Sequence, residues 1–222
     1  MRTQKVYRRQ LGLIKPSELK FSITVIGAGG IGSWATLALA KMGCSDITVI
    51  DFDTVEPKNT PSQIYTMDDV GNPKAYQLAK IVNALTGTAI FGVKAKFEDH
   101  LPVADIAPEV IICAVDSLKA RLSIWNALIK TQVKTRLYID ARMAGEDLRI
   151  ISFSPLDLTS AFEYAKTLSP KRTPHREECT ARSVVYNTFL CAGLITSTVK
   201  KYAKRQPIKP NIYMDIVNSS IY

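Results

Sequence analysis

The chain has 222 residues, of which 46% are hydrophobic and 22% are charged, and these values are typical of one large globular domain with a sizeable core. No apolar run approaches the roughly 18 residues of a membrane span and the polar start lacks a secretory signal, so we expect a cytoplasmic protein without a membrane segment. The formal net charge of +9 favours an anionic ligand, but the basic residues are dispersed without a nucleic-acid motif, so ATP or an acidic protein is favoured over nucleic acid.

An N-terminal arm over residues 1–20 precedes the first expected strand. Its pattern predicts a short helix from Val6 to Leu13 and a brief helical turn that opens at Pro16. Arg9 lies on this arm beside Arg8. Adjacent arginines on an arm are ordinary surface residues unless an anion lies within reach.

The segment 21–53 is predicted to contain a strand, a glycine-rich turn, a helix and a second strand. Its β-branched residues predict a strand over 22–26 that is buried on both faces. Small and apolar residues predict a helix over 31–42, and a strand over 47–50 then ends at Asp51.

The turn between the first strand and its helix has a GxGxxG pattern. Glycines permit a tight turn, a close approach of backbone N–H groups to a phosphate, and close packing of the helix on the strand. Asp51 follows about 20 residues after the glycines, where a carboxylate can accept hydrogen bonds from ribose hydroxyls. The pattern predicts a nucleotide site, and its glycines are Gly27, Gly29, Gly30 and Gly32.

A polar loop follows Asp51 and ends near Tyr65. Loops at the carboxyl ends of parallel strands line the ligand crevice of open α/β sheets. We therefore expect Asp53, Asn59 and Gln63 to face the nucleotide.

Lys74 follows Pro73, which suits the first position of a helix that runs to about Leu85. A lysine at a helix N-terminus is disfavoured by the helix dipole unless an anion is bound beside it. Lys74 is therefore either a phosphate ligand or a plain surface lysine.

Strands are also predicted over 89–93 and 109–115, and a helix over 117–131 follows the second of them. Asp116 repeats the strand-terminal position of Asp51, so it too is expected at the crevice. An aspartate before a helix can also be an ordinary N-cap, which needs no function.

Strands over 136–141 and 147–153 are separated by a short connection, which predicts a hairpin and a change from parallel to antiparallel pairing. A helix over 158–168, a mobile loop over 168–179, a long helix from Cys179 to about Lys204 and a strand over 211–217 complete the chain. The expected fold is α/β, with a Rossmann-like, mostly parallel sheet, helices on both faces and an antiparallel C-terminal portion.

Six motifs stand in one order along the chain: Arg9-Gln10, the glycine turn from Gly27 to Gly32, the segment from Asp51 to Val55, Asn59, the segment from Val70 to Lys74, and Asp116 with Arg121. In this order and spacing they resemble the ThiF/MoeB family of ubiquitin-activating-enzyme-like adenylyltransferases. The resemblance covers roughly residues 7–121 and, more loosely, the remainder of the chain.

The resemblance implies an enzyme that binds ATP and Mg²⁺, adenylates the C-terminal carboxylate of a ubiquitin-like protein that ends in glycine, and releases pyrophosphate. Asp51 would then hold the ribose, Asn59 and Lys74 the phosphates, and Asp116 the magnesium ion. Arg9 matches an arginine that crosses a homodimer interface to reach the partner's ATP. A conjugating or sulfur-transfer partner would act downstream.

Three departures from the family pattern are visible. Ser62 stands where members commonly have an arginine, so one phosphate contact is missing or comes from elsewhere, for example from Lys58. The two CxxC pairs that hold zinc in many members are absent, so no structural metal is expected. No further catalytic domain is recognisable, so we expect a minimal member with one adenylation domain over residues 1–222.

Cys179 is the cysteine with the strongest claim to chemistry. It follows the expected mobile loop, at the expected start of a helix, close in sequence to His175, Arg176 and Arg182, and such surroundings lower the pKa of a thiol. Cys179 is either the nucleophile that accepts the activated carboxyl group or a helix-start residue of no chemical role. The cysteines of the apolar runs, Cys113 and Cys191, are expected in the core.

Two other classes of function stay open. A nicotinamide-dependent dehydrogenase would use the glycine turn and Asp51, but it would leave Asn59, Lys74 and Asp116 without a purpose. A non-catalytic member that binds a ubiquitin-like protein without turnover is the other alternative, and Ser62 favours it.

Overall fold

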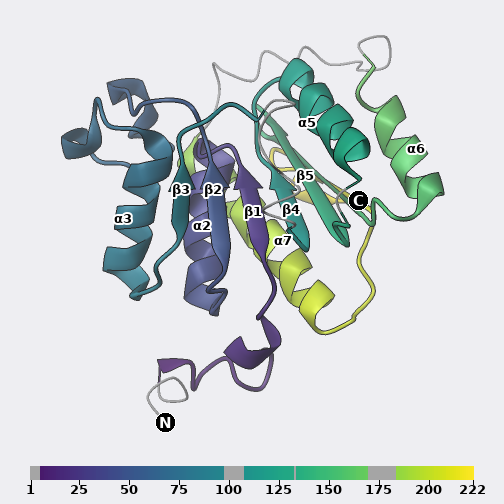
Figure 1. Ribbon diagram of the computed structural model, residues 1–222, viewed down its shortest axis with the longest axis horizontal. Coiled ribbons are helices and arrows are strands. Elements are labelled where there is room, and N and C mark those ends of the chain that lie inside the picture. The colour runs from purple at the N-terminus through teal and green to yellow at the C-terminus, as the bar shows by residue number, and fades with distance from the viewer. Residues whose placement is uncertain (1–5, 98–107, 133, 170–183) are drawn as a thin grey trace.

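The computed structural model describes residues 6–97, 108–132, 134–169 and 184–222. Its centre is an eight-stranded sheet with the strand order β3-β2-β1-β4-β5-β6-β7-β8 (Figure 1). The strands from β3 to β5 pair in parallel, and those from β5 to β8 pair antiparallel. The predicted fold class is confirmed.

The parallel half consists of short strands with apolar, β-branched sequences. Every residue of the two central strands, β1 and β4, is buried, as expected for parallel strands that are covered on both faces. The bounds are β1 Ile23–Ile26, β2 Ile47–Ile50, β3 Phe91–Val93 and β4 Val110–Cys113. The longer β5 (Leu137–Ala144) pairs parallel with β4 and antiparallel with β6, and it is counted with the antiparallel half.

The antiparallel half begins with the predicted hairpin. β5 continues to Ala144 and turns at Gly145, where a φ of 63° favours glycine, into β6 (Asp147–Phe153). β7 (Asn211–Asp215) agrees with the expected last strand, and a short β8 (Ser220–Ile221) was not predicted.

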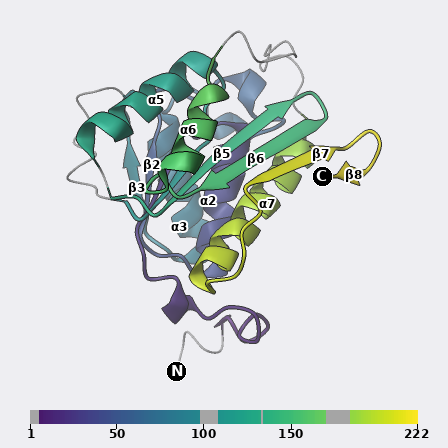
Figure 2. The same ribbon diagram turned by 90° about the vertical axis from the view of Figure 1, so that its right-hand side faces the viewer.

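Helices cover both faces of the sheet and enclose two apolar cores. One core lies between the sheet and α2, α3 and α7, and the other lies between the sheet and α5 and α6. Figure 2 shows α6 and α7 on opposite sides of the β5–β6 hairpin. The helix bounds are α2 Gly30–Met42, α3 Lys74–Thr86, α5 Leu118–Thr131, α6 Leu158–Lys166 and α7 Val185–Ala203.

Two predicted helix boundaries are wrong. Residues 7–13 form consecutive turns instead of a regular helix, and only the turn at Pro16 forms, as the short η1 (Pro16–Glu18). The long helix α7 begins at Val185, because Val184 has an extended backbone with φ −107° and ψ 147°. Cys179 and most of the expected loop lie outside the described residues.

Among the residues that the structure describes, no helix combines the length and the apolar character needed to cross a membrane.

Candidate functional site

The glycine turn is shaped by two close backbone contacts. Gly27 has a φ of 96°, and a Cβ atom on it would lie 2.7 Å from the carbonyl oxygen of Ala114. A Cβ atom on Gly32 would lie 1.8 Å from the carbonyl oxygen of Gly27. Neither position can accept a side chain without a shift of the backbone, because the obstacles are main-chain atoms.

Gly29 differs because it faces open space at the start of α2. The nearest atom to a Cβ built on Gly29 is Nε2 of Gln63, at 4.0 Å, and no side chain caps the helix. The first N–H groups of α2 are therefore available, and such groups together with the helix dipole bind phosphate.

Asp51 holds the turn against the end of β2. Its buried carboxylate accepts hydrogen bonds from the N–H of Ala28 at 2.6 Å and from the N–H of Asp53 at 2.7 Å, through different oxygens. Burial raises the pKa of Asp51, although the two N–H groups and the nearby Lys74 lower it. Each oxygen keeps lone-pair capacity for a further donor such as a ribose hydroxyl.

Lys74 is not a plain surface residue. Its side chain is only 8% exposed, and Nζ lies 3.1 Å from Oδ2 of Asp53, whose side chain is 47% exposed. The hydroxyl of Tyr65 lies 2.9 Å from the carbonyl oxygen of Ala28 and 3.3 Å from that of Lys74. Tyr65, which the sequence analysis did not single out, thus ties the glycine turn to the start of α3.

Asn59 and Gln63 are placed by a short helix, η2 (Pro57–Asn59). The buried Asn59 uses its side-chain oxygen to accept the N–H of Glu56 at 2.8 Å, so its amide nitrogen is the group left for a phosphate. Gln63 lies with Nε2 beside Gly29, and its buried Oε1 has no hydrogen-bond partner among the described residues.

Asp116 follows β4 and is exposed. The N-cap interpretation of this residue is wrong, because Ser117 caps α5 and accepts the N–H of Ala120 at 3.2 Å. No hydrogen-bond or ion-pair partner of the Asp116 carboxylate is found within the described ranges. β1 and β4 are neighbours, and the N–H of Ala114 donates to the carbonyl of Ile26 at 2.8 Å, so Asp116 comes just after a residue that contacts the glycine turn.

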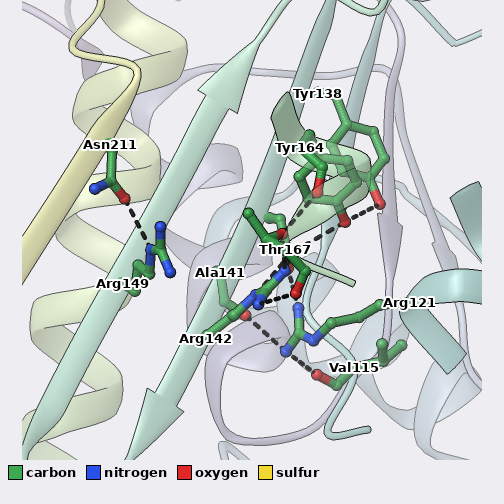
Figure 3. A network of polar contacts seen from close by, with 10 residues as sticks. Val115, Arg121, Tyr138, Ala141, Arg142, Arg149, Tyr164, Thr167 and Asn211 are labelled. Carbon is green, nitrogen blue, oxygen red and sulfur yellow. Dashed lines mark hydrogen bonds and ion pairs between the residues drawn. The ribbon is translucent and has the colours of Figure 1, made fainter. Parts of the chain in front are cut away.

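A buried polar network supports the loop that carries Asp116 (Figure 3). The guanidinium of Arg121 forms an ion pair with Asp140 and donates hydrogen bonds to the carbonyls of Val115 and Ala141. Arg142 donates from Nε to Oδ2 of Asp140 at 2.9 Å. Arg121 thereby fixes the main chain at the residue before Asp116.

Asp140 is fully buried and serves as the centre of this network. It also accepts a hydrogen bond from the Tyr164 hydroxyl at 3.0 Å. Arg142 extends the network, because its guanidinium donates a hydrogen bond to the Thr167 hydroxyl at 2.9 Å. Sequence reasoning missed this role. The available signal was the pair of charged residues, Asp140 and Arg142, in alternate positions of an otherwise apolar strand.

Phe52 and Lys96 were also missed. Phe52 follows Asp51 directly and is 52% exposed, and Nζ of Lys96 lies 5.1 Å from the centre of its ring. An exposed aromatic ring beside the carboxylate expected to meet the ribose offers an apolar surface for a base.

Arg9 is not brought to this site. The neighbouring Gln10 donates from Nε2 to the carbonyl of Met42 at 2.7 Å, at the C-terminal end of α2. The glycine turn lies at the other end of α2, a helix of 13 residues and so about 20 Å long. The exposed Arg9 therefore lies near the amino ends of the strands, opposite the crevice.

Cys179 lies outside the described residues, together with His175, Arg176 and Arg182. The other cysteines are buried, as predicted for Cys113 and Cys191, and burial raises the pKa values of Cys44 and Cys191 to about 12. These thiols are unsuited to nucleophilic chemistry.

Comparison with known proteins adds a family assignment to this geometry. The model of the ThiF family matches residues 7–217. The chain is 35% identical over 106 residues to the tRNA threonylcarbamoyladenosine dehydratase of Escherichia coli K12, which is 46% of this chain and 40% of that protein. It is 34% identical over 108 residues to the SAMP-activating enzyme E1 of Haloferax volcanii, with 46% and 39% of the two chains covered.

The fold is also similar to that of the E. coli protein MccB in a crystal structure with ATP. The TM-score is 0.73 at 17% identity, with 93% of this chain and 64% of that chain covered. The matches to the two curated relatives span less than half of each relative's length.

Proposed function

Because the chain belongs to the ThiF family, we propose that it uses ATP to adenylate the C-terminal carboxylate of a ubiquitin-like protein. The observation that carries this proposal is the meeting of an open helix N-terminus, a buried lysine and an aspartate that has no partner among the described residues, all at one edge of the sheet. A site that only binds a nucleotide would not require the buried lysine and the aspartate.

In this proposal the nucleotide lies across the carboxyl ends of β1, β2 and β4. Asp51 accepts a ribose hydroxyl, and the N–H groups around Gly29 and Gly30 hold phosphate oxygens. Lys74 turns from Asp53 towards the phosphates, where Asn59 and Gln63 offer amide donors. The similarity to SAMP-activating enzyme E1 supports a ubiquitin-like protein as the substrate class.

Asp116 fits a magnesium ion. Mg²⁺ prefers oxygen ligands and is commonly held by one or two carboxylates together with substrate phosphates. An exposed carboxylate that no other described residue pairs with is suited to it. No cluster of three or more metal-binding side chains occurs in the described part of the chain, and such a shared site needs none. When bound, the ion would neutralise phosphate charge.

The reaction joins two anions. A carboxylate oxygen of the substrate attacks the α-phosphorus of ATP, the bond from that phosphorus to the bridging oxygen breaks, and an acyl adenylate and pyrophosphate result. The protein's part is to hold the carboxylate and the α-phosphate in line and to offset their repulsion with Lys74 and the helix N-terminus.

We propose that Arg9 acts in a homodimer. Its position at the far end of α2 is supporting geometry, because the residue cannot reach the crevice of its own subunit from there. A neighbouring copy could receive it, and a C2 dimer would then contain two equivalent shared sites.

Cys179 is proposed as the acceptor in a second step. Its thiolate would attack the acyl carbon of the adenylate, AMP would leave, and a thioester would pass to a conjugating or sulfur-transfer partner. The burial of the other three cysteines leaves Cys179 as the thiol to test. We further propose that the chain acts as one adenylation domain in the cytoplasm.

A carboxylate on tRNA is the second candidate substrate. One relative is named a tRNA threonylcarbamoyladenosine dehydratase, and the net charge of +9 suits an anionic macromolecule. The dehydrogenase alternative leaves Asn59, Lys74 and Asp116 without a purpose, whereas the non-catalytic alternative is favoured by Ser62.

Isotope exchange between pyrophosphate and ATP tests the proposal. We expect exchange that depends on a small protein ending in Gly-Gly, captured from the same cell, and that disappears when its last glycine is removed. Exchange that depends on tRNA instead would favour the second candidate. ATP binding without exchange under either condition would support the non-catalytic alternative.

A further inference from the structure

Among the described residues, three arginines but only one buried carboxylate lie on the α6 side of the antiparallel half of the sheet. Asp140 forms ion pairs with both Arg121 and Arg142. Arg149 stands apart from this network, and its Nε donates to the side-chain oxygen of Asn211 at 2.9 Å. No carboxylate among the described residues forms an ion pair with Arg149.

The sheet register places two of these arginines side by side. Arg142 of β5 is directly opposite Arg149 of β6, and Arg149 is directly opposite Tyr213 of β7. Like charges directly opposite in an antiparallel pair are destabilising. Arg149 is partly buried, and burial together with the charge of Arg142 lowers the pKa of its guanidinium. In the described part of the chain, no carboxylate is in ion-pair contact with Arg149 to offset this repulsion.

The register of the sheet also shows where Arg149 lies relative to the proposed site. Cys113 of β4 is paired with Asp140, and Asp140 with Ile151 of β6, so Arg149 lies level with Val115, which immediately precedes Asp116. Two strand spacings separate β4 from β6, a distance of about 10 Å, which an extended peptide spans in about three residues.

We propose that Arg149, beside Arg142, forms a specificity subsite for an acidic side chain in the C-terminal tail of the protein substrate. This inference rests on the proposed function, because the tail must present its last carboxylate near Asp116. The acidic residue should then lie about three to five residues before the end of the substrate. Its carboxylate would accept hydrogen bonds from the terminal N–H groups of Arg149 and offset the repulsion between the two arginines.

Short synthetic peptides that end in Gly-Gly with a free carboxylate are the probe. Each peptide carries a single Glu, or a Gln in its place, at one of the positions before the two glycines, and all other residues are uncharged. Binding to the full chain is measured by fluorescence anisotropy with AMP present, so no turnover is needed. We expect the best Glu peptide to bind wild-type protein about tenfold more tightly than its Gln counterpart.

The preference should disappear in Arg149→Gln and persist in the control Arg136→Gln, which removes an exposed arginine from the other end of the β5 strand. Arg149→Gln should not lower the thermal midpoint, because it removes a like-charge contact. Equal binding of Glu and Gln peptides, no binding of any peptide, or an unchanged preference in Arg149→Gln would overturn the inference.

Two further measurements separate related failures. If Arg149→Gln weakens ATP binding, then Arg149 belongs to the nucleotide site and the inference is wrong. If the Glu preference is found but no carboxylate substrate supports pyrophosphate exchange, the subsite stands and the proposed adenylation fails.

Discussion

The two halves of the sheet differ in where their charged residues lie. The strands β1, β2 and β4 contain no charged residue, and the acidic groups Asp51 and Asp116 come only after the strands end. β5 and β6 instead contain charged residues within the strands. Parallel strands that are covered on both faces contain apolar residues, so charged residues occur only beyond their ends, where they line a ligand crevice. In the antiparallel half, a charged residue can lie within a strand if it is paired with an opposite charge.

This difference separates two kinds of recognition. The parallel half offers backbone N–H groups and strand-end carboxylates, which suit a nucleotide common to many enzymes. The antiparallel half offers charged side chains within its strands, which suit the substrate selection proposed above. Substitutions in the two halves should therefore affect different properties of the protein.

The largest effect is expected from Asp140→Ala, which leaves Arg121 and Arg142 buried without their carboxylate. We expect a loss of about 3–5 kcal/mol in the free energy of unfolding, measured by denaturant titration. Asp147→Ala on the neighbouring strand is the control. It removes a hydrogen bond to Tyr213 near solvent and should cost about 1 kcal/mol. Equal losses of unfolding free energy in the two variants would show that the buried ion pairs of Asp140 contribute no more to stability than the hydrogen bond of Asp147.

Asp116→Asn should leave the fold intact and lower pyrophosphate exchange about 10²- to 10³-fold, because it removes the charged ligand proposed for magnesium. The residue is exposed and has no partner in the described ranges, so the thermal midpoint should not move. Asp46→Asn, an exposed aspartate before β2 at the opposite edge, is the matched control and should exchange normally. Near-normal exchange in Asp116→Asn would refute the assigned role.

Lys74→Ala should lower kcat/KM for ATP in the exchange assay about 10- to 100-fold, through the loss of the charged phosphate contact proposed for this residue. Lys80→Ala removes an exposed lysine from the same helix and should have no effect. A Lys74→Ala protein with ordinary exchange would mean that the lysine serves only its ion pair with Asp53.

Mixed dimers test whether Arg9 acts across subunits. Subunits with Arg9→Ala and subunits with Asp116→Ala should each be inactive alone, and a mixed dimer should regain about half of the wild-type activity, since one of its two sites is intact. The measurement is pyrophosphate exchange on purified mixed dimers that carry two different affinity tags. Activity no higher than that of the parents would exclude the shared arrangement.

The smallest effects are expected among the cysteines. Cys191→Ala should cost about 1 kcal/mol of stability by loss of a buried side chain, with exchange unchanged. Cys179→Ala should keep both stability and exchange but lose a thiol-sensitive adduct with the ubiquitin-like partner, detected by mass spectrometry. Persistence of that adduct in Cys179→Ala would remove the residue from the proposed mechanism.

Helix boundaries were the weakest of the sequence predictions. The helix expected over Val6–Leu13 is replaced by turns at residues 7–13, because so short a segment does not form a stable helix without packing. α7 begins six residues later than expected, at Val185, since the residues near Cys179 gave no reliable N-terminal signal.

The sequence by itself determined the strands of the parallel half, the glycine turn, the hairpin and the strand-end positions of Asp51 and Asp116. These follow from local patterns, in which β-branched runs, glycines and short connections each limit the backbone directly. Only the tertiary structure decided that Lys74 is buried against Asp53, that Asp140 gathers two arginines, and that Arg142 lies opposite Arg149. Contacts of this kind join residues that lie apart in the chain, so they depend on the order and register of the strands.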